Sequence, residues 1–254
     1  MPLHDLATID VADAHPPGPA IERTTSTHCG TCAARYIGLC DALSAVDLQE
    51  LADAACWCSL PKGRILMAEG DRILYFFNIS AGHAKLYKDM QDGRRQVIGF
   101  VSAGSFLGLG TQDHYGFTTE ALDEVQFCRF ERRKLRNLFT RFPALELHLL
   151  AATCNELVVA QAQMLLLGRK TAIERLATFL LGWVDPSAGG GDPDSIVLPM
   201  GRSDTADYLG LTNETVSRSL TLLRKRHLIA LNGDQNITIV DPVALRAVGD
   251  GVAK

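Results

Sequence analysis

The sequence predicts an α+β protein in three parts: an N-terminal domain of short β-strands, a long helix, and a C-terminal winged helix-turn-helix. Three observations carry this prediction. Strand-like runs alternate with turn residues between about 60 and 130. A helical apolar pattern continues from Pro143 to Gly168. Small residues within 202–221 have the spacing that two closely crossing helices need.

Length, composition and charge bound the class of protein. A chain of 254 residues favours two domains, and 47% hydrophobic with 21% charged residues is enough for packed cores. The net charge of −4 argues against a protein coated in basic surface, although a local basic patch is compatible with it. We find no apolar run of about 18 residues and no signal sequence, so we expect a cytoplasmic protein without a membrane span. In that reducing compartment the seven cysteines are expected to be thiols or metal ligands.

The N-terminal part begins with a predicted disordered tail over residues 1–28, because its prolines come with few large apolar side chains. Residues 29–142 are expected to hold a cysteine segment and the strand domain. A short helix is predicted over 44–55, with Ser44 as its N-cap. The predicted strands recur at a spacing typical of a β-sandwich, roll or barrel, and lie at 65–67, 74–77, 84–87, 96–100 and 125–128.

Residues 143–169 are predicted to form a dimerisation helix, with Pro143 in its first turn. Further apolar residues flank the main apolar seam, so the helix needs two partners: its own strand domain and a second subunit. A single helix packed only on its own core is the alternative. The seam residues are spaced four and three apart, as in a coiled coil, and are Leu147, Ala151, Cys154, Val158, Gln161 and Leu165.

Residues 170–254 are predicted to form the winged helix-turn-helix. Ser203 or Asp204 can cap the first helix, Gly210 suits the turn, and Thr212 can cap the second helix. The core face of the second helix is expected to comprise Val216, Leu220 and Leu223. An ordinary surface pair of helices is the alternative. The wing is expected to be a hairpin of 228–231 and 237–240, with Asn232–Gly233 as its turn.

The opposite face of the second helix carries side chains suited to reading double-stranded DNA. The N-terminal end of such a helix enters the major groove. There an arginine can bind guanine O6 and N7, and a glutamate can accept from cytosine N4. Basic residues at 224–227 follow, suited to phosphates. The candidate DNA-binding residues are Asn213, Glu214, Ser217 and Arg218.

Three cysteines lie close together in the sequence as Cys29-x2-Cys32-x7-Cys40. Thiolates at this spacing suit a zinc ion or an iron–sulfur cluster, and either requires a fourth ligand. Cys56 and Cys58 are interpreted as packing residues. Cys154 falls on the helical seam and is expected at the subunit interface.

At these residues the chain resembles the CRP/FNR superfamily of bacterial regulators, specifically its FNR branch. The densest similarity is in MLLLGRKTAIERLATFL and YLGLTNETVSRSL. Glu214, Ser217 and Arg218 match the family's DNA-reading signature, which implies TTGAT-like half-sites arranged as an inverted repeat. The resemblance also implies a β-roll sensor domain like a cyclic-nucleotide-binding domain, followed by the dimerisation helix and the winged domain.

The resemblance further implies that Cys128 completes a four-cysteine [4Fe-4S] cluster with Cys29, Cys32 and Cys40. The expected protein is then an oxygen-sensing regulator, mainly an activator, that binds DNA as a homodimer at low oxygen and contacts RNA polymerase. This chain has seven residues between the second and third cysteines where the best-known members have five, and other members share the longer loop.

Three other functions are compatible with parts of the sequence. A cyclic-nucleotide receptor is disfavoured because the turn at 104–109 lacks the family's glutamate and 117–119 lacks its arginine. A zinc-dependent or thiol-disulfide regulator of the same fold remains open, because it uses the same cysteines. An iron–sulfur enzyme is disfavoured, because no phosphate-cradling loop, nucleophile elbow or acid-base set is present. We therefore expect no enzyme activity.

Overall fold

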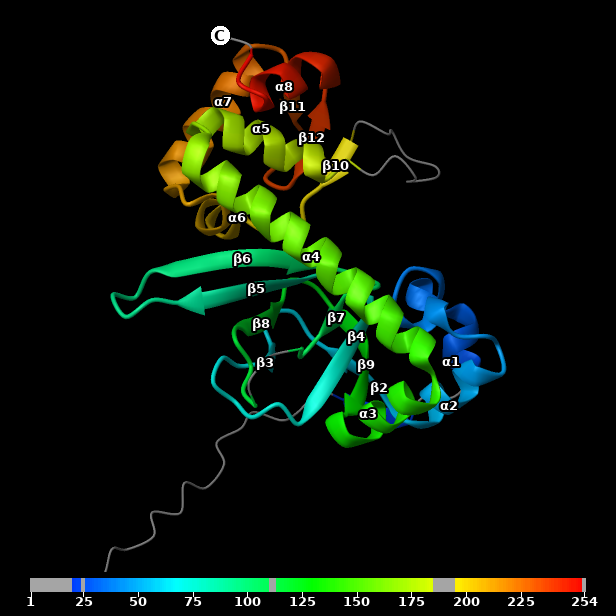
Figure 1. Ribbon diagram of the computed structural model, residues 1–254. Helices are drawn as coiled ribbons and strands as arrows, with labels where there is room; N and C mark the ends of the chain where they lie inside the picture. Colours follow the sequence, from blue (N-terminus) through cyan, green and yellow to red (C-terminus); the bar gives the residue numbers. More distant parts are fainter. Residues whose placement is uncertain (1–19, 24–25, 110–112, 185–194, 253–254) are drawn as a thin grey trace, which may run out of the picture.

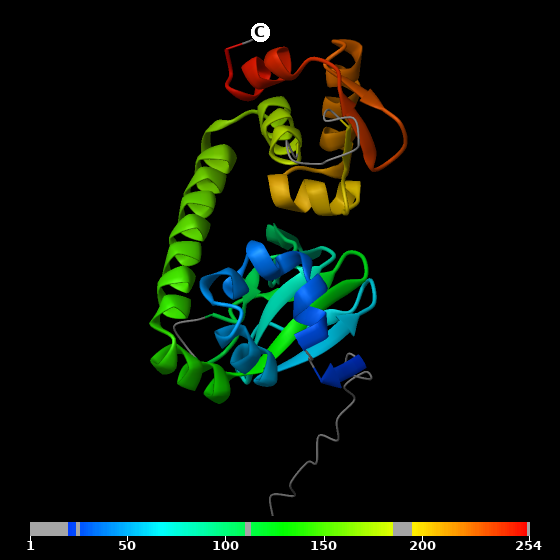
Figure 2. The same cartoon turned by 90° about the vertical axis from the view of Figure 1, so that its right-hand side faces the viewer.

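The computed structural model describes residues 20–23, 26–109, 113–184 and 195–252. It confirms the predicted α+β class: a strand domain, a long helix α4 (Pro143–Arg169) and a C-terminal helix-turn-helix domain. Figures 1 and 2 show α4 running along one side of the molecule, from the strand domain to the C-terminal domain. The predicted boundary of the long helix at 143–169 therefore agrees with the structure.

The strand domain is a β-roll of two antiparallel sheets. Its core lies between them and includes Cys58, Phe77, Ile79 and Phe127. All five predicted strand runs are present, and the sequence interpretation missed β2, β7 and β8. The first sheet has the order β1 (Ala20–Arg23), β2 (Ala55–Leu60), β9 (Val125–Glu131), β4 (Tyr75–Ala81) and β7 (Phe106–Leu107). The second has the order β3 (Ile65–Met67), β8 (Thr118–Ala121), β5 (Ala84–Asp89) and β6 (Arg95–Val101).

The prediction of a disordered tail over 1–28 is wrong at its C-terminal end. Residues 20–23 form β1, because their backbone pairs with the edge of β2, from Ala20 opposite Ser59 to Arg23 opposite Cys56. Residues 1–19 lie outside the described residues. The segment continues through α1 (Ser26–Thr31), two 3-10 turns η1 (Ala33–Tyr36) and η2 (Leu39–Ala42), and α2 (Asp47–Asp53).

The predicted helix at 44–55 is shorter than expected. It begins at Asp47, whose backbone N–H donates to Ser44 Oγ at 3.2 Å, so Ser44 does bind the first turn. The helix ends at Asp53 because β2 begins at Ala55 and pairs with β9.

The base of α4 is part of the strand domain. Leu145 is buried in the same core as Leu39 and Leu43 of the N-terminal segment, and α3 (Arg132–Arg141) packs beside it. Farther along, the helix turns its apolar seam to solvent. Leu147, Val158 and Leu165 are 68%, 63% and 61% exposed. All six predicted seam residues are exposed, as a surface reserved for a second subunit requires.

Among the described residues, α4 has the length and composition of a membrane span: 27 residues, with a mean hydropathy of 1.4 in an 18-residue window that is 11% buried. By length and composition alone, α4 could therefore cross a membrane, contrary to the expectation from the sequence. However, Asn155 and Glu156 lie in the middle of the helix, where a bilayer disfavours them. Both ends of α4 are also built into folded cores, through Leu145 and Leu166. A second copy of the helix is the better cover for the exposed face.

The C-terminal domain contains the predicted helix-turn-helix. Gly210 takes the left-handed conformation of the turn at φ 61°, and Thr212 caps the second helix by accepting from the Thr215 N–H at 3.2 Å. Val216, Leu220 and Leu223 are buried as predicted. The elements are α5 (Ala172–Gly182), β10 (Ser195–Val197), α6 (Arg202–Leu209), α7 (Asn213–Lys225), β11 (Ile229–Leu231), β12 (Asn236–Ile239) and α8 (Pro242–Gly249).

Two local predictions in this domain are wrong. The first helix starts at Arg202 after Gly201, so neither Ser203 nor Asp204 is its cap. The wing loop is longer than the Asn232–Gly233 turn, because the Asn232 N–H donates to the Asn236 carbonyl at 2.9 Å and leaves three residues between them. Strand β10 and helix α8 were not expected.

The strand domain and the helix-turn-helix touch directly. Lys85 on β5 is buried, and its Nζ lies 2.8 Å from Asp204 on α6 and 3.2 Å from Glu120 on β8. The Gln96 side chain on β6 donates to the Asp207 carbonyl at 2.7 Å. An aromatic cluster closes the interface and comprises Phe100, Phe179, Trp183 and Tyr208. Asp204 thus serves this contact between domains instead of a helix cap.

Val158→Glu is expected to convert the dimer to a monomer. The glutamate would lose its hydration at the subunit interface and would face the same glutamate of the second subunit. We therefore expect the dimer dissociation constant to rise by about 100-fold or more. Light scattering over a concentration series measures this. Glu156→Lys, on a different face of α4, is the matched control and should stay dimeric. A Val158→Glu protein that remains dimeric at micromolar concentration would contradict the seam.

Asp204→Ala is expected to loosen the contact between domains, because it leaves Lys85 buried with Glu120 alone. We expect a loss of about 1–3 kcal/mol in unfolding free energy and faster amide exchange in α6. Asp207→Ala is the control, since that carboxylate forms no hydrogen bond or ion pair among the described residues. Equal behaviour of the two variants would argue against the ion pair.

Candidate cysteine site and DNA-reading helix

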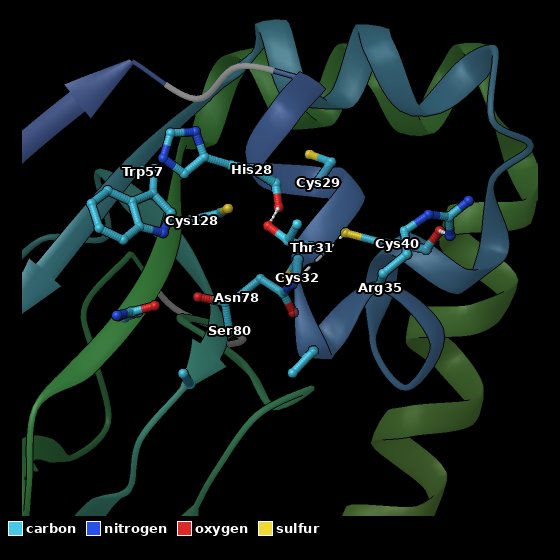
Figure 3. A pocket seen from close by; sticks show the side chains of 13 residues that line it. His28, Cys29, Thr31, Cys32, Arg35, Cys40, Trp57, Asn78, Ser80 and Cys128 are labelled. Atoms are coloured by element: carbon cyan, nitrogen blue, oxygen red, sulfur yellow. Dashed lines mark hydrogen bonds between the residues drawn. The ribbon is translucent and has the colours of Figure 1, made fainter.

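Three cysteines of the N-terminal segment and one distant cysteine, Cys128, line one cavity of about 210 Å³. Cys29 belongs to α1, Cys32 follows it, Cys40 lies in η2, and Cys128 lies on β9. Figure 3 shows Cys128 on one side of the cavity, with Cys29 and Cys40 on the other. The N-terminal segment therefore covers the outer face of the first sheet and brings the four predicted ligands together.

Strand register explains why Cys128 belongs to this site and two other cysteines do not. Cys128 is directly opposite Trp57 of β2 and Asn78 of β4, so all three side chains share the outer face of the sheet. Cys56 and Cys58 alternate with Trp57 and point to the inner face, where Cys58 is fully buried in the core. Their interpretation as packing residues is confirmed.

Two contacts hold the loop that carries Cys40. The Arg35 guanidinium donates to the carbonyls of Cys40 at 2.7 Å and Leu43 at 3.2 Å, which ties η1 to η2. Gly38 lies so close to the β6–β7 turn that a Cβ there would stand 2.9 Å from the Gly104 carbonyl oxygen. Gly104 itself has φ 92°, a conformation that favours glycine.

Burial makes these thiols hard to ionise. Desolvation raises the pKa of Cys40 to about 12, and the neighbouring Cys29 and Cys32 add to the shift. Desolvation also raises the pKa of Cys128, with Cys40 as the next contributor. All seven cysteines are free thiols. At neutral pH the thiols of Cys40 and Cys128 therefore stay protonated and are weak nucleophiles, and a bound metal has to displace their protons.

Four thiols are the donor set of either a zinc ion or an iron–sulfur cluster. Within the described ranges, no three His, Cys, Asp or Glu side chains converge closely enough to hold one metal ion. Zinc needs four ligands at about 2.0–2.3 Å from one centre. A four-cysteine cluster instead spreads its iron atoms, each bound by its own thiolate. Asn78 Oδ1 and Ser80 Oγ also lie buried at this cavity without a hydrogen-bond partner among the described residues, so the site offers polar groups to a bound species.

Sequence reasoning missed several residues of this site. His28, whose ring lies 5.1 Å from that of Trp57, and Arg35 also line the cavity, as do Asn78 and Ser80. The positions of Trp57 and Asn78 beside Cys128 depend on which strands pair, and no local pattern signals that pairing.

Helix α7 presents the four predicted DNA-binding residues on an accessible face. Asn213, Glu214 and Arg218 are exposed and Ser217 is half-buried. Arg218 Nη2 lies 2.6 Å from Glu214 Oε1, with the two side chains 78% and 70% exposed. The basic residues at 224–226 follow on the exposed end of the helix. Both charged groups of the pair are thus accessible from solvent.

Comparison with known proteins gives consistent results. Residues 174–248 match the Crp-like helix-turn-helix domain, and residues 57–142 match the cyclic nucleotide-binding domain. The chain is 36% identical to the nitrogen fixation regulation protein FixK of Bradyrhizobium diazoefficiens, over 87% of this chain and 93% of that protein. It is 38% identical to the transcriptional activatory protein AadR of Rhodopseudomonas palustris, over 83% and 88%. The solved structure of FixK2 from Bradyrhizobium japonicum superposes with a TM-score of 0.71 at 34% identity, covering 76% of this chain and 96% of that one.

Proposed function

The chain belongs to the CRP/FNR family of dimeric, DNA-binding transcription regulators, and on this premise we propose that it regulates transcription in response to oxygen. In this proposal Cys29, Cys32, Cys40 and Cys128 hold a [4Fe-4S] cluster, and the homodimer binds inverted repeats of TTGAT-like half-sites at low oxygen. The observation that carries the proposal is the single cavity that collects these four thiols. Membership of the family also means that the protein is a regulator and not an enzyme.

The packing of the cysteine segment suggests how the site acts on the dimer. The turn η2, which contains Cys40, lies against α4, and Leu39 and Leu43 share a core with Leu145 at the base of that helix. Cys29, Cys32 and Cys40 on the segment and Cys128 on β9 would hold the cluster together and so would join the segment to the sheet. Without that tie, the segment is held by its apolar contacts, by the pairing of β1 with β2 and by the hydrogen bond from Asn78 to Cys40. Its release would unpack the base of α4 and weaken the subunit interface, and a monomer has the affinity of one half-site only.

The geometry of α7 supports a specific reading of one base pair. Arg218 can donate two hydrogen bonds to the guanine of TTGAT, and Glu214 can accept from the paired cytosine. Because the two side chains are already paired at 2.6 Å, they are held near each other before DNA arrives. Asn213 and Ser217 reach neighbouring bases or phosphates, and residues 224–226 bind the backbone.

The remaining parts of the proposal follow from the family. AadR is described as an activatory protein, so we propose mainly activation, through contact with RNA polymerase in the cytoplasm. The match to a cyclic nucleotide-binding domain describes the roll, and we propose that this chain binds no cyclic nucleotide. Its turn at 104–109 has no glutamate and 117–119 has no arginine to neutralise a cyclic phosphate.

The test is anaerobic purification, then an iron and sulfide assay, then DNA binding before and after air. We expect about four iron and four sulfide per chain and loss of operator binding in air. One zinc per chain without sulfide, or a disulfide that forms and controls binding, would support the zinc-dependent or thiol-based regulator instead.

Cys40→Ser and Cys128→Ser are each expected to reduce iron and sulfide to a small fraction of the wild-type content, because each removes one of four thiolate ligands. Cys56→Ser is the matched control, since Cys56 points to the other face of the same sheet. It should retain the full content. Iron loading that survives Cys128→Ser would remove that residue from the ligand set.

Arg218→Ala is expected to lower operator affinity by about 1–3 kcal/mol per half-site and to relax the preference at the G·C pair. Lys225→Ala should weaken binding to all sequences alike and reduce the salt dependence by about one phosphate contact. Titrations of matched and substituted duplexes at several salt concentrations measure both. Uniform weakening by Arg218→Ala would mean that Arg218 contacts only the backbone.

A further inference from the structure

We propose that Asn78 and Ser80 donate hydrogen bonds to sulfur in the cysteine site and thereby slow the loss of its cluster in air. This inference rests on the proposed function, because it concerns the same cavity. It assigns a role to two side chains that are not ligands. Asn78 acts through Cys40 as a positioning residue, and Ser80 supplies a second donor from the same strand.

Asn78 occupies the centre of the site. It lies on β4 directly opposite Cys128 on β9, and its Nδ2 donates to Cys40 Sγ at 3.9 Å. The amide therefore stands between the ligand of the strand and a ligand of the N-terminal segment. Figure 3 shows Asn78 and Ser80 at the floor of the cavity, between Cys128 and Cys40. Few residues can contact both halves of the site at once.

The burial of these groups is the second observation. Asn78 is 1% exposed and Ser80 is 6% exposed. Ser80 Oγ, which can donate, has no hydrogen-bond partner within the described part of the chain, and neither has the acceptor Asn78 Oδ1. A buried polar group without a partner costs about 1–3 kcal/mol, so an apolar side chain would be expected at such positions unless something uses the polar atoms. Both residues line the cavity that the four thiols line.

The missing partner of Ser80 follows from its hydroxyl, which can donate, while thiolate and sulfide sulfur accept. Asn78 donates through Nδ2, which already contacts Cys40 Sγ, and its unpartnered Oδ1 is an acceptor that sulfur does not satisfy. Arg35 also lines the cavity and could donate to sulfur, but its guanidinium already donates to the carbonyls of Cys40 and Leu43. The dipoles of Asn78 and Ser80 are thus well placed to stabilise negative charge on sulfur. Hydrogen bonds to sulfur stabilise the more negative, reduced state and raise the reduction potential of such clusters.

The experiment uses the full-length protein purified without oxygen. The variants are Asn78→Leu, Ser80→Ala and Ser80→Thr, which keeps the hydroxyl. Thr119→Val is the matched control, because Thr119 Oγ1 is also buried without a partner but lies on β8, in the other sheet. The readouts are iron and sulfide per chain, the midpoint potential measured anaerobically, and the first-order rate at which visible absorbance falls after air is added.

We expect Ser80→Ala and Asn78→Leu to load iron and sulfide, to have lower midpoint potentials, and to lose absorbance faster by on the order of fivefold, the rate equivalent of one hydrogen bond. Ser80→Thr and Thr119→Val should behave as wild type. A merely structural role for the two residues would change unfolding without moving the anaerobic midpoint potential.

The outcomes separate the two proposals. Full iron and sulfide in wild type, with unchanged potential and rate in Ser80→Ala, would overturn this inference and leave the proposed function intact. Absence of iron and sulfide from wild type would overturn both. If Asn78→Leu does not fold, the comparison of Ser80→Ala with Ser80→Thr decides, because these differ from wild type by one atom or one methyl group.

Discussion

The apolar contact of Leu39 and Leu43 with Leu145 joins two parts of the protein that would otherwise be independent. On one side of it lies a short segment with three of the seven cysteines. On the other lies the base of a 27-residue helix whose remaining length is exposed. A segment held between a sheet and a helix transmits any change in its own position to both. A change in the position of the cysteine segment would therefore also change the packing at the base of α4.

The C-terminal end of α4 is attached to the C-terminal helix-turn-helix domain by several hydrogen bonds. Arg175 of α5 donates to the carbonyls of Leu167, Lys170 and Leu209 at 2.8–2.9 Å, and so ties the end of α4 to both α5 and α6. Lys85 and Gln96 hold the same domain to the β-roll from a second direction. The position of α7 therefore depends on the helix and on the roll together. A change in either contact can reorient the face that carries Glu214 and Arg218.

The sequence predicted well the elements that depend on residues close together in the chain, and it missed those that depend on residues far apart. The helix α4 and the pair α6–α7 were predicted well because their apolar spacing, the turn at Gly210 and the cap at Thr212 are local. Strand β1 was missed because it exists only through pairing with β2. Asp204 was predicted as a cap, but a lysine 119 residues away in the sequence binds it instead. Cys128 as a ligand came from family resemblance, since nothing around it marks it. Trp57 and Asn78 could not be found without the register of β9 with its neighbours.

The close approach of Gly38 to Gly104 has a consequence for how such a regulator can diverge. One added methyl group at Gly38 would press on a backbone carbonyl and act as a wedge between the loop and the roll. The wedge would shift Cys40 while leaving every thiol and every base-reading side chain unchanged. The arrangement of the thiols can thus be changed from a position that carries neither a thiol nor one of the exposed residues of α7. A substitution at Gly38 would therefore alter the geometry of the cysteine site without removing any of its four thiols.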